Sequence, residues 1–301
     1  MKRLITAAVA ALLLALPIQT VYAQQAARPD IVEVVEITGE INDFTAKQLA
    51  KQIEAVNENP KVKAVLLIVD TPGGGAIASA ATYEELARIK VPVVGWCSNV
   101  CASGGMYILM SPAVKLIAVR SEAIAGSIGV IMQSTRYNRL LEWAKIDSET
   151  YKSGSLKDAG NPARSVTEDE KRYLQSIVDD LAERFYDVVE KARPAIDAKQ
   201  FADIKTARIF IGSSAVKAGL ADEVMTRDQA IDKAKALSGS KLIFTREEMK
   251  KMSSAADAPA IRYSAPVLGT LDSRLAKLMD LVEEIHAGES GRFSYRMPYS
   301  F

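Results

Sequence analysis

The stretch VKAVLLIVDTPGGGAIASAATYEELARIKVPVVGWC, residues 62–97, contains a complete strand–turn–helix–strand unit. Its first nine and last seven residues are almost entirely apolar, as in strands that are buried on both faces of a sheet. A proline and three glycines break the chain after the first run, and the next residues have helical spacing. Consecutive parallel strands require such a crossover, so the stretch predicts an α/β fold with a largely parallel sheet.

The same alternation continues on both sides of this unit. The spacing of apolar residues predicts strands at 31–41, 114–119 and 123–132, and helices at 43–60, 103–112 and 137–146. The unit of strand, turn and helix thus repeats four times. In such folds the functional turns lie at the carboxyl ends of the strands.

From residue 151 the pattern changes. The segment YKSGSLKDAGNPARS, residues 151–165, is polar and rich in glycine, which predicts a loop. Thr167 followed by Glu170 is a capping box, and it predicts a long helix that ends near Ala192. Residues 208–224 predict a strand, a short helix and a second strand. We expect the α/β domain to cover residues 24–237.

The first residues have the order of a secretory signal peptide. Two cations precede the apolar run from Leu4 to Leu16, and Pro17 interrupts it. Small residues, Val21 and Ala23, stand three and one positions before the expected cleavage. We therefore expect residues 1–23 to be removed and the protein to be exported to the periplasm or cell envelope. A retained membrane anchor is the alternative, and a peripheral contact with the membrane stays open.

The last part of the chain, residues 238–301, is expected to form an extension of the domain. It begins with a linker and continues with a helix and an aromatic tail, residues 291–301. One face of that helix is apolar, which fits either packing on the domain or a contact with another subunit. The residues of this face are Leu271, Leu275, Leu278, Val282 and Ile285.

Composition excludes several classes of function. The net charge is only +1, and no stripe of lysine and arginine appears, so nucleic acid is not an expected partner. Neither a metal-ligand spacing nor a phosphate-binding G-x-x-x-x-G-K-[ST] motif occurs, so we expect no metal and no cofactor. The two cysteines, Cys97 and Cys101, fit either a disulfide or a pair of buried thiols.

Two glycine turns carry the candidate chemistry. The first, DTPGGG at residues 70–75, can direct backbone N–H groups outward at the end of a buried strand. The second, ASGG at residues 102–105, presents Ser103 at the start of a helix. One N–H group from each turn could stabilise a developing oxyanion. The alternative is that both turns only allow close packing of helices.

A nucleophilic serine needs a general base. His286 is the only histidine and lies outside the α/β domain, and Cys101 replaces the first glycine of a G-x-S-x-G elbow. A lysine with a lowered pKa is therefore the expected base. Lys152 and Lys157 of the glycine-rich loop compete for this role. An S-x-x-K match at residues 214–217 lacks the accompanying motifs of penicillin-binding proteins.

These motifs together resemble those of the signal peptide peptidase A family of serine proteases, which have the Clp-protease/crotonase fold. The matching pieces run in family order from about residue 31 to residue 225. They are ITGEI, DTPGGG, ASGGMYI, AGSIGVI, YKSGSLKD followed by SVTEDEK, and GLADEV. The chain differs from many members in having Cys101 at a position of small residues, and it is too short for the duplicated form of the family.

The resemblance implies roles for five residues. Ser103 would be the nucleophile and Lys157 its general base, while Ser127 would hydrogen-bond the lysine amine. The N–H groups of Gly74 and Gly104 would form the oxyanion hole. The implied activity is endopeptidase cleavage of signal peptides or other extended or misfolded envelope polypeptides through an acyl-enzyme. A homo-oligomer, in which neighbouring subunits complete the site, is also implied.

Two other functions use similar turns. A crotonase-like acyl-CoA enzyme would place the same two amides around a thioester oxyanion, but export would separate it from coenzyme A. An inactive peptide-binding scaffold would require loss of Ser103 or Lys157, and both are present.

Overall fold

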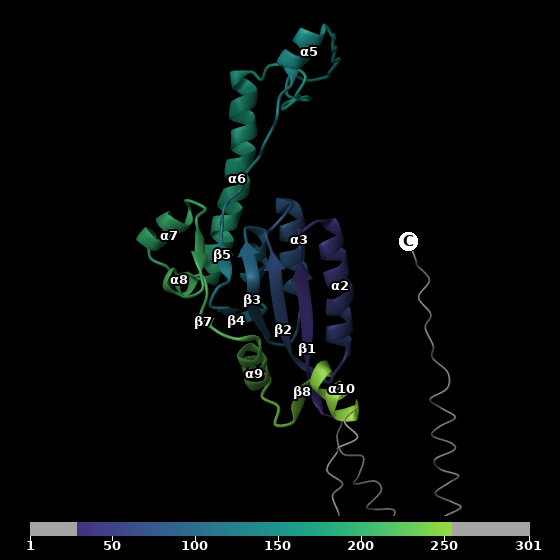
Figure 1. The fold of residues 1–301 in the computed structure, drawn as a ribbon, viewed down its shortest axis with the longest axis vertical. Helices are drawn as coiled ribbons and strands as arrows, with labels where there is room; N and C mark the ends of the chain where they lie inside the picture. The colour runs from purple at the N-terminus through teal and green to yellow at the C-terminus, as the bar shows by residue number, and fades with distance from the viewer. Residues whose placement is uncertain (1–28, 255–301) are drawn as a thin grey trace, which may run out of the picture. The chain divides into compact units, whose positions relative to one another are not determined.

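The computed structural model describes residues 29–254 (Figure 1), which form a single sheet with helices on both sides. The predicted signal peptide, the apolar helix face at residues 271–285, His286 and the aromatic tail lie outside these residues. The sheet order is β6-β5-β3-β2-β1-β8, with β4 paired to β3 and β7 paired to β4. The strands are β1 Asp30–Thr38, β2 Val62–Thr71, β3 Val93–Ala102, β4 Val114–Val119, β5 Ile124–Gly126, β6 Ile209–Ile211, β7 Glu223–Val224 and β8 Ile243–Thr245.

All pairings are parallel except that of β5 with β6, which is antiparallel. This confirms the α/β class that the repeated strand–turn–helix pattern predicts. The helices are α2 Asp43–Glu58, α3 Ala76–Leu86, α4 Gly104–Leu109, α5 Asn138–Ala144, α6 Glu168–Ala192, α7 Ala198–Ile204, α8 Ser213–Lys217, α9 Arg227–Leu237 and α10 Arg246–Ser254.

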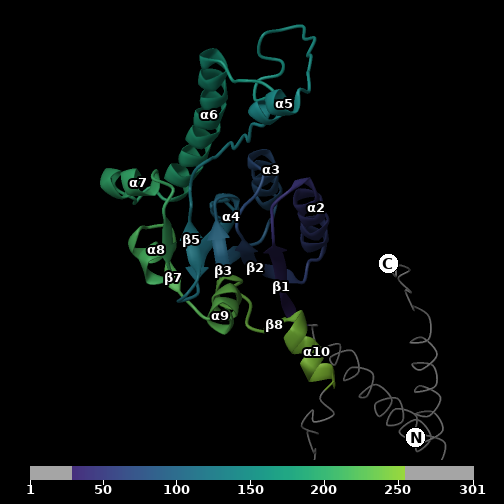
Figure 2. The same ribbon diagram turned by 45° about the horizontal axis from the view of Figure 1, so that its top comes forward.

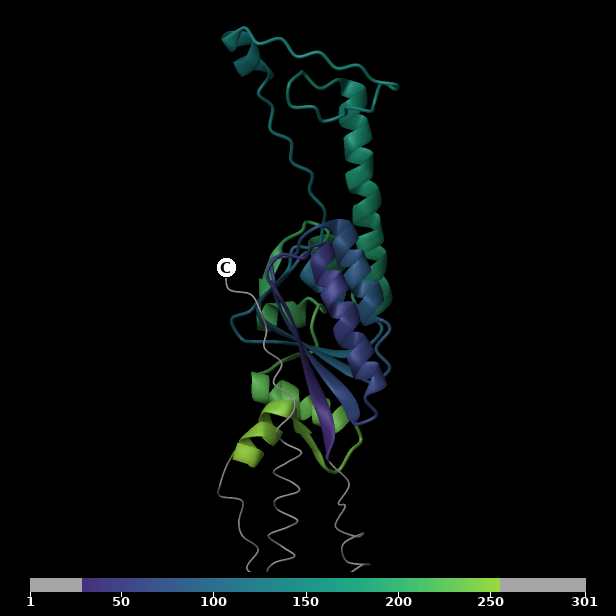
Figure 3. The ribbon, with the colours of Figure 1, turned by 90° about the vertical axis from the view of Figure 1, so that its right-hand side faces the viewer.

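Side chains of the central strands alternate between two apolar clusters, one on each face of the sheet. On one face, residues such as Val65 and Leu67 of β2 belong to the cluster that includes the buried residues of α2, α3 and α4. On the other face, Leu66 and Ile68 pack with Ala230 and Ile231 of α9. Figure 3 shows helices on both sides of the strands. Burial on both faces explains why β2 and β3 are almost continuously apolar.

A bulge divides β3 into two parts. Cys97 pairs with Val69 of β2, whereas Cys101 pairs with Thr71, so Ser98–Val100 bulge out opposite a single residue of β2. The first part of β3 pairs with β4, and the second part, residues 100–102, pairs with β5. A disulfide between Cys97 and Cys101, with Cα atoms 5.8 Å apart, spans the bulge. Of the two arrangements open from the sequence, the structure has the disulfide.

The sheet continues beyond residue 237, the predicted end of the α/β domain. Strand β8, Ile243–Thr245, pairs in parallel with β1 at the edge of the sheet, and α10 follows directly. Strand β5 is shorter than predicted, because only Ile124–Gly126 of the apolar run 123–132 are in a strand. Among residues 29–254 no helix has both the length and the apolar character needed to cross a bilayer.

Residues 131–183, called the arm below, extend away from the sheet. They comprise an extended segment, α5, the glycine-rich loop and the first part of α6, and Figures 1 and 2 show α5 and the start of α6 beyond the ends of the strands. Within α6 only Glu170, Phe185 and Val189 are buried. Phe185 and Val189, near the carboxyl end of α6, belong to the core cluster. The capping box predicted at Thr167 is present.

Candidate active site

Ser103 lies between the end of β3 and the start of α4, as the sequence predicts. Its backbone has φ 50° and ψ −118°, a strained conformation for a residue with a side chain. Two hydrogen bonds hold it there: its N–H donates to the Gly126 carbonyl at 2.9 Å, and its own carbonyl accepts from the Tyr107 N–H at 3.1 Å. The turn therefore fixes the direction in which the hydroxyl leaves the backbone.

The turn after β2 touches Ser103 and requires glycine at two positions. Gly73 has φ 102°, and a Cβ there would lie 2.8 Å from the Ser103 Cβ. Gly74 passes directly against Ile41, where any side chain would collide with the Ile41 backbone. The Ile41 N–H donates to the Gly73 carbonyl at 2.8 Å, and the Gly75 N–H donates to the Ile41 carbonyl at 3.0 Å. Within residues 29–254 this bridge leaves the N–H of Gly74 without a hydrogen-bond partner.

Gly104 is the first residue of α4, so its N–H has no partner within the helix. A Cβ at Gly104 would collide with the hydroxyl of Ser79, and it would lie 3.1 Å from Ile41 Cδ1. Ser79 belongs to α3, is 3% exposed, and its Oγ has no hydrogen-bond partner among residues 29–254. The close packing at Gly104 therefore joins α3 and α4 directly beside Ser103.

Ser127 lies at the next turn, after β5. It has φ 52°, and its N–H donates to the Arg208 carbonyl at 2.9 Å. The preceding Gly126 has φ 108°, and a Cβ there would lie 2.7 Å from the same carbonyl. Strand β5 pairs in parallel with the end of β3 that leads into Ser103, so both serines follow the carboxyl ends of neighbouring strands.

Ser103, Ser127, Gly74 and Gly104 line one groove, with a volume of about 1030 Å³. Its other walls are the start of α3, the segment after Ser127 and residues 175–191 of α6. The ring of Tyr107 packs edge-on against Phe185 of α6, with centroids 4.9 Å apart. Burial raises the pKa of Tyr107, so its hydroxyl stays neutral near pH 7. A cavity of this size and shape can accept an extended peptide.

Lys157 does not line this groove. It is exposed in the glycine-rich loop that precedes α6. The start of α6 lies about 26 Å along the helix axis from Phe185, at the usual rise per residue. One chain thus brings four of the five predicted site residues together and holds the proposed base apart. The Lys157 amine makes no hydrogen bond or ion pair with any other residue of 29–254.

Two other lysines, Lys191 and Lys205, line the groove. The amine of Lys205 lies 4.5 Å from the centroid of the Tyr186 ring and 4.0 Å from a carboxylate oxygen of Glu183. These contacts hold the Lys205 amine against side chains of α6.

Sequence reasoning missed two residues of the site. Thr71 is fully buried, and its hydroxyl accepts from the Gly73 N–H at 3.0 Å, which fixes the turn after β2. Ser79 fills the space beside Gly104. A threonine and a serine within an apolar pattern gave no signal of these contacts, because both depend on which segments meet in space. Among the described residues, no cluster of histidine, cysteine, aspartate and glutamate could hold a metal ion.

Two protein families match parts of the chain. The Clp protease family matches residues 24–122, which include the turn after β2 and Ser103. The fold is thus the Clp-protease/crotonase type that the sequence resemblance implies. Peptidase family S49 matches residues 85–241, about half of the chain. The chain belongs to peptidase family S49.

Individual relatives cover most of the chain. The "Putative signal peptide peptidase SppA" of Enterococcus faecium is 33% identical over 267 residues, 86% of this chain and 72% of the relative. A "Putative protease" of Synechocystis sp. is 36% identical over 68% of this chain and 73% of its own length. The "Serine protease SPPA, chloroplastic" of Arabidopsis thaliana is 31% identical over 64% of this chain and 28% of its own length.

Proposed function

We propose that the chain is a serine endopeptidase with Ser103 as nucleophile and Lys157 as general base. The observation that carries this proposal is the placement of Ser103 in a strained turn between two glycine amides, Gly74 and Gly104, on a peptide-sized groove. Membership of a peptidase family makes peptide bonds the expected substrate.

In the proposed reaction the neutral amine of Lys157 takes the proton of Ser103 as Oγ attacks the scissile carbonyl carbon. The N–H groups of Gly74 and Gly104 bind the resulting oxyanion, and each such donor contributes about 3 to 4 kcal/mol. The carbon–nitrogen bond then breaks, and the lysine gives its proton to the leaving amine. Water attacks the acyl-enzyme with the same lysine as base, which releases the acid and regenerates Ser103. Ser127 hydrogen-bonds the amine and holds it in place.

We infer further that Lys157 acts on the Ser103 of a neighbouring copy. Its amine is exposed and unpaired within residues 29–254, and the arm that carries it is unusually apolar at its surface. Nine large apolar side chains of the arm are exposed, among them Trp143 at 81% and Tyr151 at 91%. Apolar patches of this kind are typical of surfaces that pack against another chain. A homo-oligomer would cover the patch and deliver the base.

The test uses two inactive variants, Ser103→Ala and Lys157→Ala. Each alone should lose at least about a thousandfold in kcat, because nucleophile and base act as a unit. Coexpression of the two should restore activity, since one chain supplies Ser103 and the other Lys157. Peptidase assays on the mixed oligomer, with each variant alone as control, measure this.

Restoration by mixing supports a site shared between copies, and absence of restoration contradicts it. Full activity of either single variant contradicts the dyad itself. The wild-type rate should rise with pH above neutrality, because only the uncharged amine accepts a proton. A rate that does not change between about pH 6 and 9 would argue against a lysine base.

We also propose that the protein is exported to the periplasm or envelope and acts there on signal peptides or misfolded polypeptides. Its Cys97–Cys101 disulfide supports this part of the proposal, because disulfides persist in oxidising compartments. The similarity to a relative named signal peptide peptidase supports the substrate class.

A further inference from the structure

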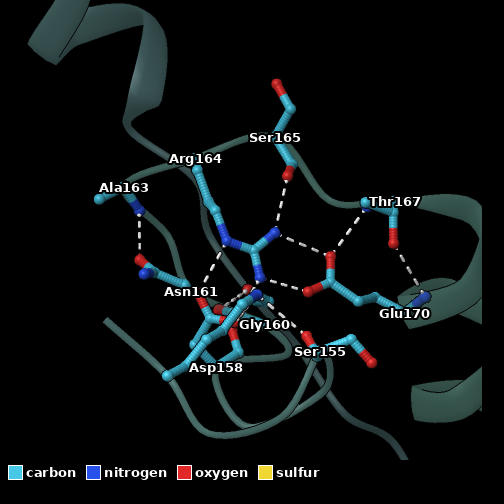
Figure 4. A network of polar contacts seen from close by, with 11 residues as sticks. Ser155, Asp158, Gly160, Asn161, Ala163, Arg164, Ser165, Thr167 and Glu170 are labelled. Carbon is cyan, nitrogen blue, oxygen red and sulfur yellow. Dashed lines mark hydrogen bonds and ion pairs between the residues drawn. The ribbon is translucent and has the colours of Figure 1, made fainter. Parts of the chain in front are cut away.

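Four charged side chains form a series of ion pairs at the loop that carries Lys157, and Figure 4 shows the contacts that Arg164 makes within it. We call this network, which consists of Lys152, Asp158, Arg164 and Glu170, the clasp. The guanidinium of Arg164 lies at its centre. Its Nε and Nη2 donate to the two carboxylate oxygens of Asp158, each at 2.8 Å. Its Nη1 donates to Glu170 Oε2 at 2.9 Å, and Nη2 donates to the other oxygen of Glu170.

The other contacts of the clasp leave little room for rearrangement. Lys152 Nζ donates to Asp158 Oδ1 at 2.5 Å and to the Ser155 carbonyl at 3.0 Å. Arg164 also donates to the carbonyls of Asp158 and Ser165. Fork-to-fork pairs of this kind combine strength with a fixed geometry, which a lysine in place of Arg164 could not reproduce.

The clasp ties the loop to the first turn of α6. Glu170 is only 2% exposed, and besides Arg164 it accepts from the Thr167 N–H at 2.9 Å as part of the capping box. Hydrogen bonds from Arg164, and then from the Thr167 backbone, hold the pKa of Glu170 at about 2. Hydrogen bonds from Arg164 and Lys152 likewise lower the pKa of Asp158 below its usual range. Both carboxylates therefore stay charged throughout the pH range of a lysine base.

Lys157 is the residue directly before Asp158, yet it does not share in the clasp. Three successive turns, with Lys157, Ala159 and Asn161 donating to carbonyls three residues earlier, hold the backbone on either side of it. The carboxylate next in sequence accepts three hydrogen bonds from Arg164 and Lys152, and the structure gives it no contact with the Lys157 amine. An available carboxylate would stabilise the ammonium form and oppose base catalysis.

We propose that Arg164 is a positioning residue for the base: it locks the Lys157 loop onto α6 and withholds Asp158 from the Lys157 amine. This inference rests on the proposed role of Lys157. It adds a second requirement for a lysine base, because the amine must be presented in a fixed place and must also lack a neighbouring counter-ion.

The charged groups that face Asp158 are Lys152 and Arg164 from the loop and, through Arg164, Glu170 from α6. The segment 134–138 hydrogen-bonds the loop through neutral groups. Ser134 donates to the Gly160 carbonyl, and Asn138 donates to the Ser165 hydroxyl. Arg164 makes two of the three hydrogen bonds to the Asp158 carboxylate, so its removal leaves Lys152 as the remaining partner of Asp158.

The test is the substitution Arg164→Gln in the full-length oligomer. We expect kcat to fall about tenfold to a hundredfold with little change in KM, because the groove is untouched while the base is misplaced. The alkaline midpoint of the pH profile should rise, since Asp158, then held by Lys152 alone, becomes available to pair with the Lys157 ammonium. Backbone amides of residues 154–163 should exchange with solvent faster than in the wild type.

A double variant and a matched control make the readout specific. Adding Asp158→Asn to Arg164→Gln should return the midpoint to its wild-type value while kcat stays low, because no carboxylate is left to pair. Arg172→Gln is the control: Arg172 lies on α6, and its ion pair with Asp169 is exposed on both sides. It should keep the wild-type kcat and midpoint.

An unchanged kcat in Arg164→Gln overturns the proposal, and so does a lower kcat with an unmoved midpoint, which would indicate only a structural role. If Arg164→Gln does not fold, Arg164→Lys carries the test, because it keeps a cation beside buried Glu170. We expect a reduced kcat there, and a wild-type kcat overturns the proposal. Failure of the proposed function is seen separately, as activity that survives Lys157→Ala.

Discussion

Single residues determine the candidate site through the space that they leave open. Gly74 and Gly104 are each pressed against a neighbour, Ile41 and Ser79, at a distance that excludes a side chain. The strained backbone of Ser103 persists because these contacts and its hydrogen bond to Gly126 surround it. The sequence indicates that glycines are needed here, but it does not identify the partners that make them necessary.

The contact between Gly104 and Ser79 predicts a rescue experiment. Gly104→Ala should lower kcat by about a hundredfold, because the new methyl group displaces the amide proposed for the oxyanion hole. Adding Ser79→Gly removes the side chain that the methyl group would meet and should recover part of the activity. Steady-state peptidase assays measure both effects, with Ser79→Gly alone as the control.

No recovery in the double variant would show that the methyl group acts on something other than Ser79. Ile41 is the next candidate, since its Cδ1 would lie 3.1 Å from the added carbon.

At the scale of elements, strand β3 combines two functions. Its first half is an ordinary core strand, and its second half leads into Ser103 after a bulge that changes its partner from β4 to β5. The Asp70 carboxylate fills the mouth of the bulge by accepting from Asn99 at 2.7 Å and from the Val100 N–H at 3.1 Å. The disulfide then joins the two halves of the strand.

The disulfide should contribute measurably to stability. Replacing both cysteines, Cys97→Ala with Cys101→Ala, should lower the free energy of unfolding by about 2 kcal/mol, the loop-entropy value for so short a loop. It should also lower kcat, because the bulge that leads into Ser103 loses its covalent restraint. Urea unfolding and peptidase assays of the variant against the oxidised wild type measure the two effects.

Equal unfolding free energies in the two proteins would mean that the hydrogen bonds of Asp70 alone maintain the bulge.

Periodicity predicted most elements of the fold but not the places where they meet. The apolar runs of β2, β3 and β4 and the capping box of α6 were sufficient to locate those elements. The run at residues 123–132 was interpreted as one strand, yet only its first part pairs. An apolar pattern indicates that one face of a segment is buried, but it does not identify the segment that buries it. In the arm, large apolar side chains are exposed in this chain.

The candidate site, like the fold, was predicted from the sequence only in part. The turns with Ser103, Gly74 and Gly104 stood out from glycine spacing, and Lys157 and Ser127 came from the family resemblance. Arg164 and Glu170 gave no signal beyond that of loop and helix-cap residues, because their meeting with Asp158 depends on the folded loop.

At the scale of the whole molecule, the proposed export makes a testable claim about the mature chain. Protein isolated from the envelope of producing cells should begin at Gln24, because small residues at Ala23 and two positions before it suit cleavage there. Its two cysteines should resist thiol labelling until a reductant is added. N-terminal sequencing and mass spectrometry of labelled protein measure both properties.

A chain that retains Met1 in the cytoplasm, with both thiols free, would contradict export. The internal control is the same protein labelled after reduction under denaturing conditions, which should show two thiols.

The length of the arm has a consequence for when the proposed enzyme becomes active. On the proposed mechanism, a newly made chain holds its base outside its own groove and therefore resembles a zymogen. It would be harmless during synthesis and transport, when copies are few and dilute. Proteolysis would begin only where enough chains accumulate to meet, so local abundance would act as the trigger.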